Sequence, residues 1–306
     1  MSSGVSVIIP TRDRGRLLVD AVRSALTAPE PPLEVIVVDA GSSDGSVDAL
    51  AQFDDSVRIV GGGRNAGAGR NAGAAAARGE YLGFLDSDDL MLPGKTTCLV
   101  EALEGAPDAA LVHGTTEVVD ERGAPLPEQT AAQRASFTHG QRLGTSYAAL
   151  AGYCAMFTSA TLMRRSAFDS VGGFDVSLDA YEDWDLYLRL SLRWRLLYAD
   201  CPAAAYRIWP GNVGWRRTAE WTVRVAEKHL AALPDLPAAE RERARYGFLR
   251  RLASSHHVLV ERSPARRSAM AAVRLAPRRA LRDSDVRRPL LRSLLPARIL
   301  ERRRPA

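Results

Sequence analysis

The sequence lacks several features that would by themselves assign a protein to a class. None of its 306 residues belong to a run approaching the roughly 20 apolar residues that a membrane-spanning helix requires. The first residues do not combine a basic patch with an apolar core, so we expect no secretory signal. Cysteines are few: Cys98, Cys154 and Cys201 are widely spaced and odd in number, which predicts neither a disulfide framework nor a zinc site. These features are typical of a protein in a reducing cytoplasm.

An excess of positive over negative charge is absent from most of the chain and concentrated at one end. Residues 262–306 carry fourteen arginines against three acids, a net charge of +11, so residues 1–261 carry −6 of the total of +5. The acidic body shows no nucleic-acid footprint, and we expect no nucleic-acid partner. The basic segment is either an amphipathic, peripheral contact to an anionic membrane or a helical arm packed on the body or on a subunit, with solvated arginines. We favour the arm, because Pro277, Pro289 and Pro296 would interrupt a long helix.

Apolar, β-branched runs alternate with helical patterns over the first 90 residues. We predict strands at residues 5–9, 35–38, 57–60 and 81–85. The segments between them predict three helices. The first spans residues 14–26, the second begins at about residue 46, and the third ends at about residue 78. This rhythm predicts an α/β fold with a mostly parallel sheet covered by helices on both faces. Ligands of such sheets bind beyond the carboxyl ends of the strands, so the loops after these four strands are the candidate sites.

The rest of the chain is less regular. Residues 111–153 are polar and turn-rich, which predicts a loop region covering an acceptor cleft. Strands are expected at residues 160–163, 196–199 and 203–208, and a helix at residues 182–192. From residue 215 the pattern is mostly helical, broken at Pro234, Pro237 and Pro264. We therefore predict a domain at residues 1–212 and a helical, arginine-rich extension at residues 213–306.

Two aspartates follow the strand at residues 81–85 directly. Asp86 and Asp88 are separated by one short residue. Carboxylates at this spacing can hold a hard divalent cation, which in turn binds a diphosphate and stabilises the charge that develops on it as it leaves. The same residues could simply cap the helix that follows, so the aspartates alone leave both interpretations open.

The segment NAGAGRNAG at residues 65–73 contains the Gly-x-Gly pattern of dinucleotide-binding loops. Such a loop normally follows the first strand of its unit, whereas this one follows the third. Asp86 ends the next strand, as the pattern requires, but it belongs to a crowded acidic cluster better suited to a cation. Nicotinamide binding is therefore disfavoured. Arg70 by itself indicates no function, and it becomes a candidate site residue only when the other loops are considered with it.

Glu182 and Asp183 open the predicted helix at residues 182–192, after a glycine-rich turn. Acids in a first turn stabilise a helix through its dipole, which would be a purely structural role. The functional interpretation is a general base, a carboxylate that takes the proton of an acceptor hydroxyl while the oxygen attacks a sugar carbon. An in-line displacement of this kind inverts the anomeric centre.

Six short segments occur in a fixed order along the chain. They are SVIIPTRDR (6–14), VVDAGSSDG (37–45), NAGAGRNAG (65–73), FLDSDD (84–89), VGGFD (171–175) and EDWDL (182–186). Each is weak alone, but together, at this spacing, they closely resemble family 2 of the glycosyltransferases, enzymes of the GT-A fold. The resemblance covers residues 4 to 212, and it implies a nucleotide-sugar-binding and catalytic domain there.

The resemblance implies roles for individual residues at the nucleotide. Pro10, Thr11 and Asp13 would line the nucleoside pocket, and Asp39 would help to bind the base or ribose. Arg70 would contact the nucleotide. The implied nucleotide-binding set is Pro10, Thr11, Asp13, Asp39, Arg70 and Asp86.

The resemblance also implies the catalytic machinery. Asp86 and Asp88 match the Asp-x-Asp motif of the family, with Asp88 as the direct ligand of Mg²⁺ or Mn²⁺. Asp183 matches the catalytic base, and Glu182 is expected to contact the acceptor.

Two positions depart from the family pattern. Ala40 replaces a second aspartate of many relatives, so one contact to the base is missing and a preference for uracil is less secure. Trp209 replaces a histidine that assists metal or diphosphate binding in relatives; an indole cannot ligate a metal, but it can stack or donate one hydrogen bond. The metal is then held by fewer protein ligands, or the site is altered.

The sequence therefore predicts an inverting glycosyltransferase with a nucleotide diphosphate sugar as donor. UDP or dTDP is favoured as the carrier, with GDP as the alternative, and the acceptor is a polysaccharide, a lipid-linked saccharide or a secondary metabolite. Two other functions remain open. One is a catalytically degenerate binding or scaffold protein, which Ala40 and Trp209 would favour. The other is a sugar nucleotidyltransferase, which would leave the Glu182–Asp183 pair unexplained.

Overall fold

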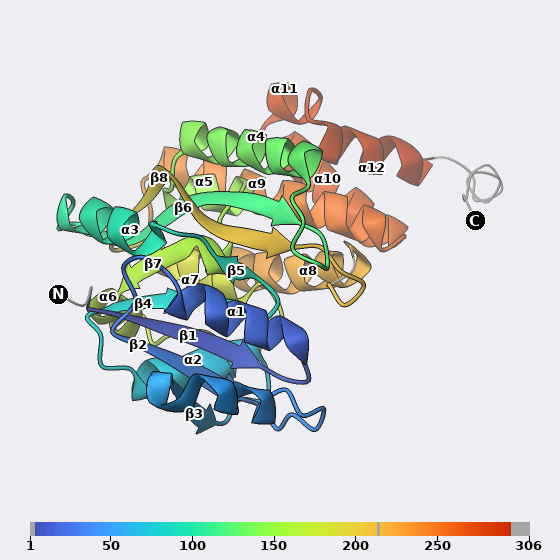
Figure 1. Ribbon diagram of the computed structural model, residues 1–306. Helices are drawn as coiled ribbons and strands as arrows, with labels where there is room; N and C mark the ends of the chain where they lie inside the picture. Colours follow the sequence, from blue (N-terminus) through green and yellow to red (C-terminus); the bar gives the residue numbers. More distant parts are fainter. Residues whose placement is uncertain (1–3, 213–214, 295–306) are drawn as a thin grey trace. The chain divides into compact units, whose positions relative to one another are not determined.

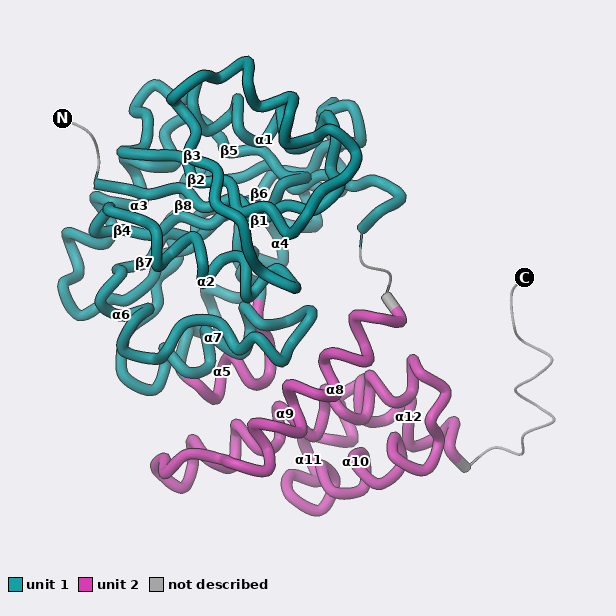
Figure 2. The backbone as a smooth tube through the Cα atoms, turned by 90° about the horizontal axis from the view of Figure 1, so that it is seen from below, with its two compact units in different colours: residues 1–146, 155–212 teal, residues 147–154, 213–306 magenta. Residues whose placement is uncertain are grey.

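A computed structural model of the protein describes residues 4–212 and 215–294. The chain forms two compact units, which Figure 2 shows in different colours. Unit 1 comprises Met1–Ser146 and Ala155–Asn212, and unit 2 comprises Tyr147–Cys154 and Val213–Ala306. The chain thus passes into unit 2 after Asn212, where the sequence analysis places its domain boundary, and also over the short segment Tyr147–Cys154.

Unit 1 is built on an eight-stranded sheet with the strand order β3-β2-β1-β4-β7-β6-β8-β5 (Figure 1). Four parallel strands form one half: β1 (Val5–Thr11), β2 (Glu34–Asp39), β3 (Val57–Gly61) and β4 (Tyr81–Phe84). β7 (Thr161–Arg164) runs antiparallel to both β4 and β6 (Ala109–Val119). β6 is parallel to β8 (Arg195–Arg207), and β5 (Leu90–Met91) is antiparallel to β8. The predicted α/β class with a mostly parallel sheet is confirmed.

The helices of unit 1 connect these strands. They are α1 (Arg16–Leu26), the 3₁₀ helix η1 (Asp48–Ser56), α2 (Ala66–Ala76), α3 (Lys95–Glu104), α4 (Pro127–Leu143), the 3₁₀ turn η2 (Thr158–Ala160), α6 (Arg165–Ser170) and α7 (Glu182–Leu190). The predicted helix from about residue 46 is therefore a 3₁₀ helix, and it is interrupted at Asp54, whose φ is 46°.

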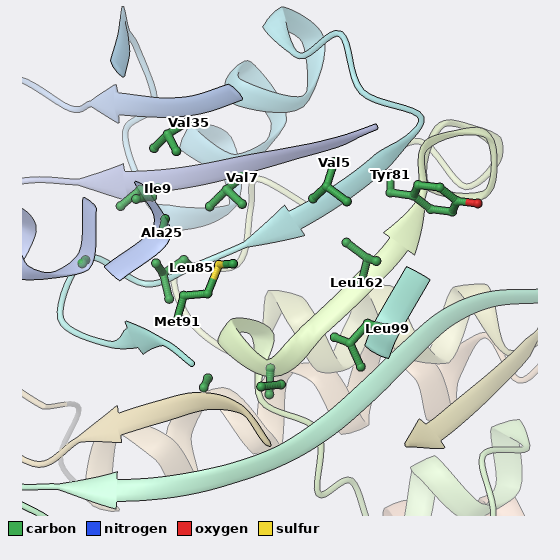
Figure 3. Close-up of a cluster of buried hydrophobic side chains, with 14 of the residues drawn as sticks. Val5, Val7, Ile9, Ala25, Val35, Tyr81, Leu85, Met91, Leu99 and Leu162 are labelled. Carbon is green, nitrogen blue, oxygen red and sulfur yellow. The ribbon is translucent and has the colours of Figure 1, made fainter. Parts of the chain in front are cut away.

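Strand β1 is buried on both faces, as the continuous apolar run predicts. Val7 and Ile9 belong to the core cluster that includes Leu18 and Val22 of α1, and Figure 3 shows part of this cluster, with side chains from strands and from helices. Ile8 points to the opposite face, where it meets α2 at Gly73. A Cβ atom at Gly73 would overlap the Ile8 side chain, so the glycine permits α2 to pack closely on β1. Gly73, the last glycine of the segment at residues 65–73, thus serves helix packing.

Strand β1 continues through Pro10, where the sequence analysis expects it to end. The carbonyl of Ile8 accepts a hydrogen bond from the Leu85 amide, so the backbone groups of Ile8 point toward β4. The backbone of Pro10, two residues further along the strand, points the same way. Pairing with β4 stops at Phe84, so the missing N–H of Pro10 removes no hydrogen bond between strands.

The prediction of a loop region at residues 111–153 is wrong. β6 occupies the start of this segment as a long interior strand, and α4 and α5 (Tyr147–Gly152) fill much of the rest. The strand is hard to recognise because polar side chains are buried in it: His113, Thr115 and Thr116 are all at most 7% exposed. The two strands expected at residues 196–208 are likewise the single strand β8.

The cysteine prediction also needs correction, because the structure joins Cys98 of α3 and Cys201 of β8 in a disulfide. The two residues are 103 positions apart, so their spacing carries no signal, and only the packing of α3 on β8 brings them together. The argument from unpaired cysteines for a reducing compartment therefore no longer holds. Cys154 is not part of this disulfide.

Unit 2 is helical, as predicted for the extension. It contains α5, α8 (Trp215–Ala231), α9 (Ala238–Val258), α10 (Arg262–Leu275), α11 (Pro277–Ala280) and α12 (Ser284–Leu294). Its core is formed by Tyr246, Leu249, Ala253, Ala269, Ala272, Ala280 and Val286. α10 and α12 pack on α9 and on each other within unit 2.

The prolines interrupt these helices less than predicted. Pro264 lies in the first turn of α10, and Pro289 lies inside α12. Pro296 and four of the fourteen arginines fall in residues 295–306, outside the described residues. Over the described part of the chain, none of the helices has the length and apolar character needed to cross a membrane.

Candidate active site

The expected nucleoside residues lie together at the carboxyl ends of β1 and β2. Thr11 pairs in register with Asp39. The Asp13 amide donates to Ser42 Oγ at 3.0 Å, and Asp13 Oδ1 accepts from the Ser43 amide at 2.8 Å. The loops after the two strands are therefore held against each other, with Asp13 in a left-handed conformation at φ 49°. Such strained backbone is common at ligand-binding sites.

The side chains of Asp39 and Thr11 at this edge differ in their hydrogen bonding. The Asp39 carboxylate accepts from Ser42 Oγ at 2.6 Å and from the Ser42 amide at 3.0 Å, so it is oriented by its own loop. The hydroxyl of Thr11 is buried and has no hydrogen-bond partner among the described residues. A buried polar atom without a partner is costly unless a ligand supplies one, so Thr11 fits a contact to the nucleotide.

Arg70 connects the loop after β4 to the start of α7. Its guanidinium bonds Asp86 Oδ1 at 2.5 Å through Nη2 and Glu182 Oε1 through Nη1. Burial alone would lower the pKa of Arg70, but the carboxylates of Asp86, Glu182 and Asp183 reverse this and raise it, so the group stays charged. Gly67 makes this approach possible, since a Cβ there would lie 3.3 Å from Glu182 Cγ. Glu182 is only 5% exposed and is paired with Arg70, while its expected contact to the acceptor stays a prediction.

Asp183 is held in the first turn of α7. Its Oδ2 accepts from Thr158 Oγ1 at 2.9 Å, and its Oδ1 accepts from the Trp184 amide at 2.7 Å. Burial and the nearby charge of Glu182 raise the pKa of Asp183 to about 6, while Arg70 and the Thr158 hydroxyl partly oppose the rise. A carboxyl group with this pKa is largely ionised at pH 7 and is a stronger base than an ordinary aspartate.

Asp88 is bound by the tryptophan that replaces the family histidine. The indole Nε1 of Trp209 donates to Asp88 Oδ2 at 2.9 Å, and the Arg14 guanidinium lies 5.3 Å from the centroid of the Trp209 ring. The expectation that Trp209 stacks or donates one hydrogen bond is confirmed on both counts. Burial and the charge of Asp86 raise the pKa of Asp88, so the pair of carboxylates concentrates negative charge that a cation would relieve.

A buried turn that the sequence analysis did not single out joins these groups. Thr158 bonds Asp183, and the next residue, Ser159, donates to Asp89 Oδ2 at 2.6 Å and accepts from the Asp86 amide at 3.1 Å. Lys95 Nζ donates to the Ser159 carbonyl at 2.7 Å. The segment around Thr158 has no motif, and it lies well separated in sequence from the groups it contacts, so it carried no signal.

Arg207 anchors the acidic loop from the other side and was also missed. It is almost fully buried; its amide donates to Asp89 Oδ1 at 3.0 Å and its Nε donates to the Asp88 carbonyl at 2.9 Å. The loop that carries Asp86 and Asp88 is thus fixed by residues from β8 and η2. Asp89 belongs to the acidic run seen in the sequence, but its role as the anchor of the loop appears only in the fold.

The acidic loop after β4 and the Glu182–Asp183 pair are therefore joined by direct contacts, and Thr11 and Asp39 lie at the carboxyl ends of the neighbouring strands β1 and β2. Arg70 links the acidic loop to the Glu182–Asp183 pair, and Thr158–Ser159 link the same two segments by a second route. Among the described residues, no group of three or more His, Cys, Asp or Glu side chains is arranged to hold a metal ion.

Comparison with known proteins agrees with this geometry. The family model "Glycosyl transferase family 2" matches residues 6–172. An uncharacterised glycosyltransferase of Bacillus subtilis, YwdF, is 28% identical over 245 residues, covering 76% of this chain and 86% of that protein.

Solved structures show the same fold. Residues 1–349 of S. aureus TarS in complex with UDP-GlcNAc match with a TM-score of 0.65 at 18% identity, covering 94% of this chain and 88% of that one. The mannosyltransferase PcManGT of Pyrobaculum calidifontis, in complex with GDP-Man and Mn²⁺, matches with a TM-score of 0.61 at 17% identity, covering 94% and 83%. Both are glycosyltransferases of the GT-A fold, and the predicted fold is confirmed. Because the family model matches more than half of its length, the chain belongs to glycosyltransferase family 2 and is an enzyme of nucleotide-sugar glycosyl transfer.

Proposed function

We propose that this enzyme inverts the anomeric centre of its donor sugar, with Asp183 as the general base. The acceptor hydroxyl oxygen attacks the anomeric carbon, its proton passes to Asp183, and the bond from that carbon to the diphosphate oxygen breaks. The observation that carries the proposal is the placement of Asp183, a carboxylate with a pKa of about 6 that is linked through Glu182 and Arg70 to Asp86. Arg70 offers fixed positive charge near the departing diphosphate.

The donor we propose is a UDP- or dTDP-sugar. Pro10, Thr11, Asp13 and Asp39 form the nucleoside side of the site, and the unpartnered Thr11 hydroxyl supports a polar contact there. The UDP-GlcNAc complex of TarS supports a uridine carrier, and the GDP-Man complex of PcManGT keeps GDP as the alternative. For the acceptor we retain a polysaccharide, a lipid-linked saccharide or a secondary metabolite.

Asp86 and Asp88 would hold the divalent metal, Mn²⁺ or Mg²⁺. The residues fit such an ion: Arg70 bonds one oxygen of Asp86 and Trp209 one oxygen of Asp88, while burial and the charge of Asp86 raise the pKa of Asp88. Small hard cations are commonly held by one or two carboxylates plus substrate phosphates. When bound, the metal would neutralise charge on the diphosphate leaving group. The Mn²⁺ in the PcManGT structure supports this assignment.

Two measurements test the proposal. Thermal-shift screening of nucleoside diphosphates with and without Mn²⁺ should show the largest stabilisation for UDP or dTDP with metal, because a ligand of the native state raises apparent stability. Asp183→Asn should abolish transfer while the donor still binds. Full turnover by that variant would refute the base role, and a wild-type protein that binds donor but never transfers or hydrolyses it would instead indicate a degenerate binding protein. NMR of the product linkage would establish whether the anomeric configuration inverts.

A further inference from the structure

The C-terminal helices of unit 2 expose charge of one sign. Nine arginines of α10, α11, α12 and the turn between the last two are exposed: Arg266, Arg267, Arg274, Arg278, Arg279, Arg282, Arg287, Arg288 and Arg292. Arg279 lies over the ring of Tyr246, and Arg292 contacts His257. For the other seven, the described residues provide no carboxylate within ion-pair distance. We call these nine side chains the arginine surface.

The acids of the same segment are used in packing instead. Asp283 accepts a hydrogen bond from the Tyr246 hydroxyl at 3.1 Å, and Asp285 pairs with Arg250 at 3.0 Å; both partners belong to α9. The negative charges of residues 262–294 are therefore partly neutralised against α9, while the positive charges remain in solvent. A helical arm that needed only solubility would gain from mixed signs on its exposed face, so the separation of signs calls for an anionic partner.

Apolar side chains are exposed among these arginines. Leu291 is 56% exposed on the face of α12 that also exposes Arg287, Arg288 and Arg292, at the i, i+3 and i+4 spacing of one helix face. Leu281 is 59% exposed beside Arg282 in the turn before α12. An exposed leucine surrounded by arginines matches the boundary between phosphate headgroups and acyl chains, where the arginine binds phosphate and the leucine enters the apolar layer.

We propose that the arginine surface, with Leu281 and Leu291, binds the surface of an anionic lipid bilayer. A nucleic acid or another soluble polyanion would also attract the arginines, but neither would favour the exposed leucines. This binding is independent of the sugar chemistry at Asp183, so either conclusion can fail without the other.

Vesicle co-sedimentation of the full chain tests the proposal. The protein should bind phosphatidylcholine vesicles that contain phosphatidylglycerol, and it should bind much less to phosphatidylcholine alone or in high salt. Arg287→Gln, Arg288→Gln and Arg292→Gln together should weaken binding about 100-fold, given about 1 kcal/mol for each arginine near an anionic surface. Leu281→Ser with Leu291→Ser should weaken it about tenfold at unchanged charge.

A matched control removes three exposed arginines from unit 1: Arg122→Gln, Arg142→Gln and Arg193→Gln. This variant should bind vesicles as the wild type does, and the thermal unfolding midpoints of all variants verify that they fold. Absence of wild-type binding to the anionic vesicles would overturn the proposal. An equal loss of vesicle binding in the control variant would also overturn it. So would a protein that binds heparin as well as vesicles and whose binding does not change when the leucines are replaced.

Discussion

Replacing Thr158 by valine should shift the pH dependence of transfer while leaving the architecture of the site intact. Valine has nearly the shape of threonine but lacks the hydroxyl, so it cannot donate the 2.9 Å hydrogen bond to Asp183 Oδ2. This hydrogen bond stabilises the ionised carboxylate and opposes the rise that burial causes in its pKa. Its loss should therefore raise the pKa of Asp183 further above 6.

The size of the shift follows from the strength of a hydrogen bond to a charged group. Such a bond contributes about 1.5 kcal/mol, and 1.36 kcal/mol corresponds to one pH unit, so the pKa should rise by about one unit. A general base works only when deprotonated, so activity increases with pH through its pKa. At pH 6 about half of the wild-type enzyme but only about a tenth of the variant would be competent, and near pH 8.5 the two would converge.

The assay is the pH profile of kcat/KM for donor consumption, measured from pH 5 to pH 9 with Thr158→Ser as the control. Serine retains the hydroxyl, so its acid limb should coincide with that of the wild type. If Thr158 had only a structural role, the valine variant would lose activity by the same factor at every pH. An acid limb that stays near pH 6 in the valine variant would refute the reasoning, as would an unchanged limb in Asp183→Asn.

Three further changes have expected outcomes. Gly73→Ala should lower the free energy of unfolding by about 1–3 kcal/mol, because the added Cβ overlaps the Ile8 side chain of β1. Gly61→Ala is the control and should have little effect, since the space around Gly61 is open. Urea unfolding measures both variants. Under oxidising conditions Cys98→Ser should lower the unfolding free energy by about 2–4 kcal/mol, since the disulfide to Cys201 constrains the unfolded chain; insensitivity of the wild type to reductant would contradict this. Trp209→Phe removes the indole N–H that orients a carboxylate of the acidic pair, so the Mn²⁺ affinity measured by electron paramagnetic resonance should fall about tenfold; an equal affinity would argue against that role.

Short-range patterns predicted the first half of the fold well. The runs at residues 5–9 and 35–38 are strands buried on both faces, and a continuous apolar segment of that length signals such a strand without any tertiary information. The same pattern did not identify strand β6, because His113 and two threonines occupy buried positions in it and interrupt the apolar run. The Phe157 amide donates to His113 Nε2, so one of these polar groups is satisfied only by a partner 44 residues away.

The sequence by itself predicted that acids follow the strand at residues 81–85 and therefore stand at the carboxyl edge of the sheet, because strand ends follow from local periodicity. Their catalytic roles were implied by the family resemblance and stay predictions. Only the tertiary structure decided how those acids are used. Glu182 is the partner of Arg70 across 112 residues, and Trp209 reaches Asp88 across 121 residues. These contacts depend on where whole strands and helices pack, and residue spacing along the chain does not encode them. The pKa of Asp183 depends on the same packing, since burial and its neighbours' charges set the cost of ionisation.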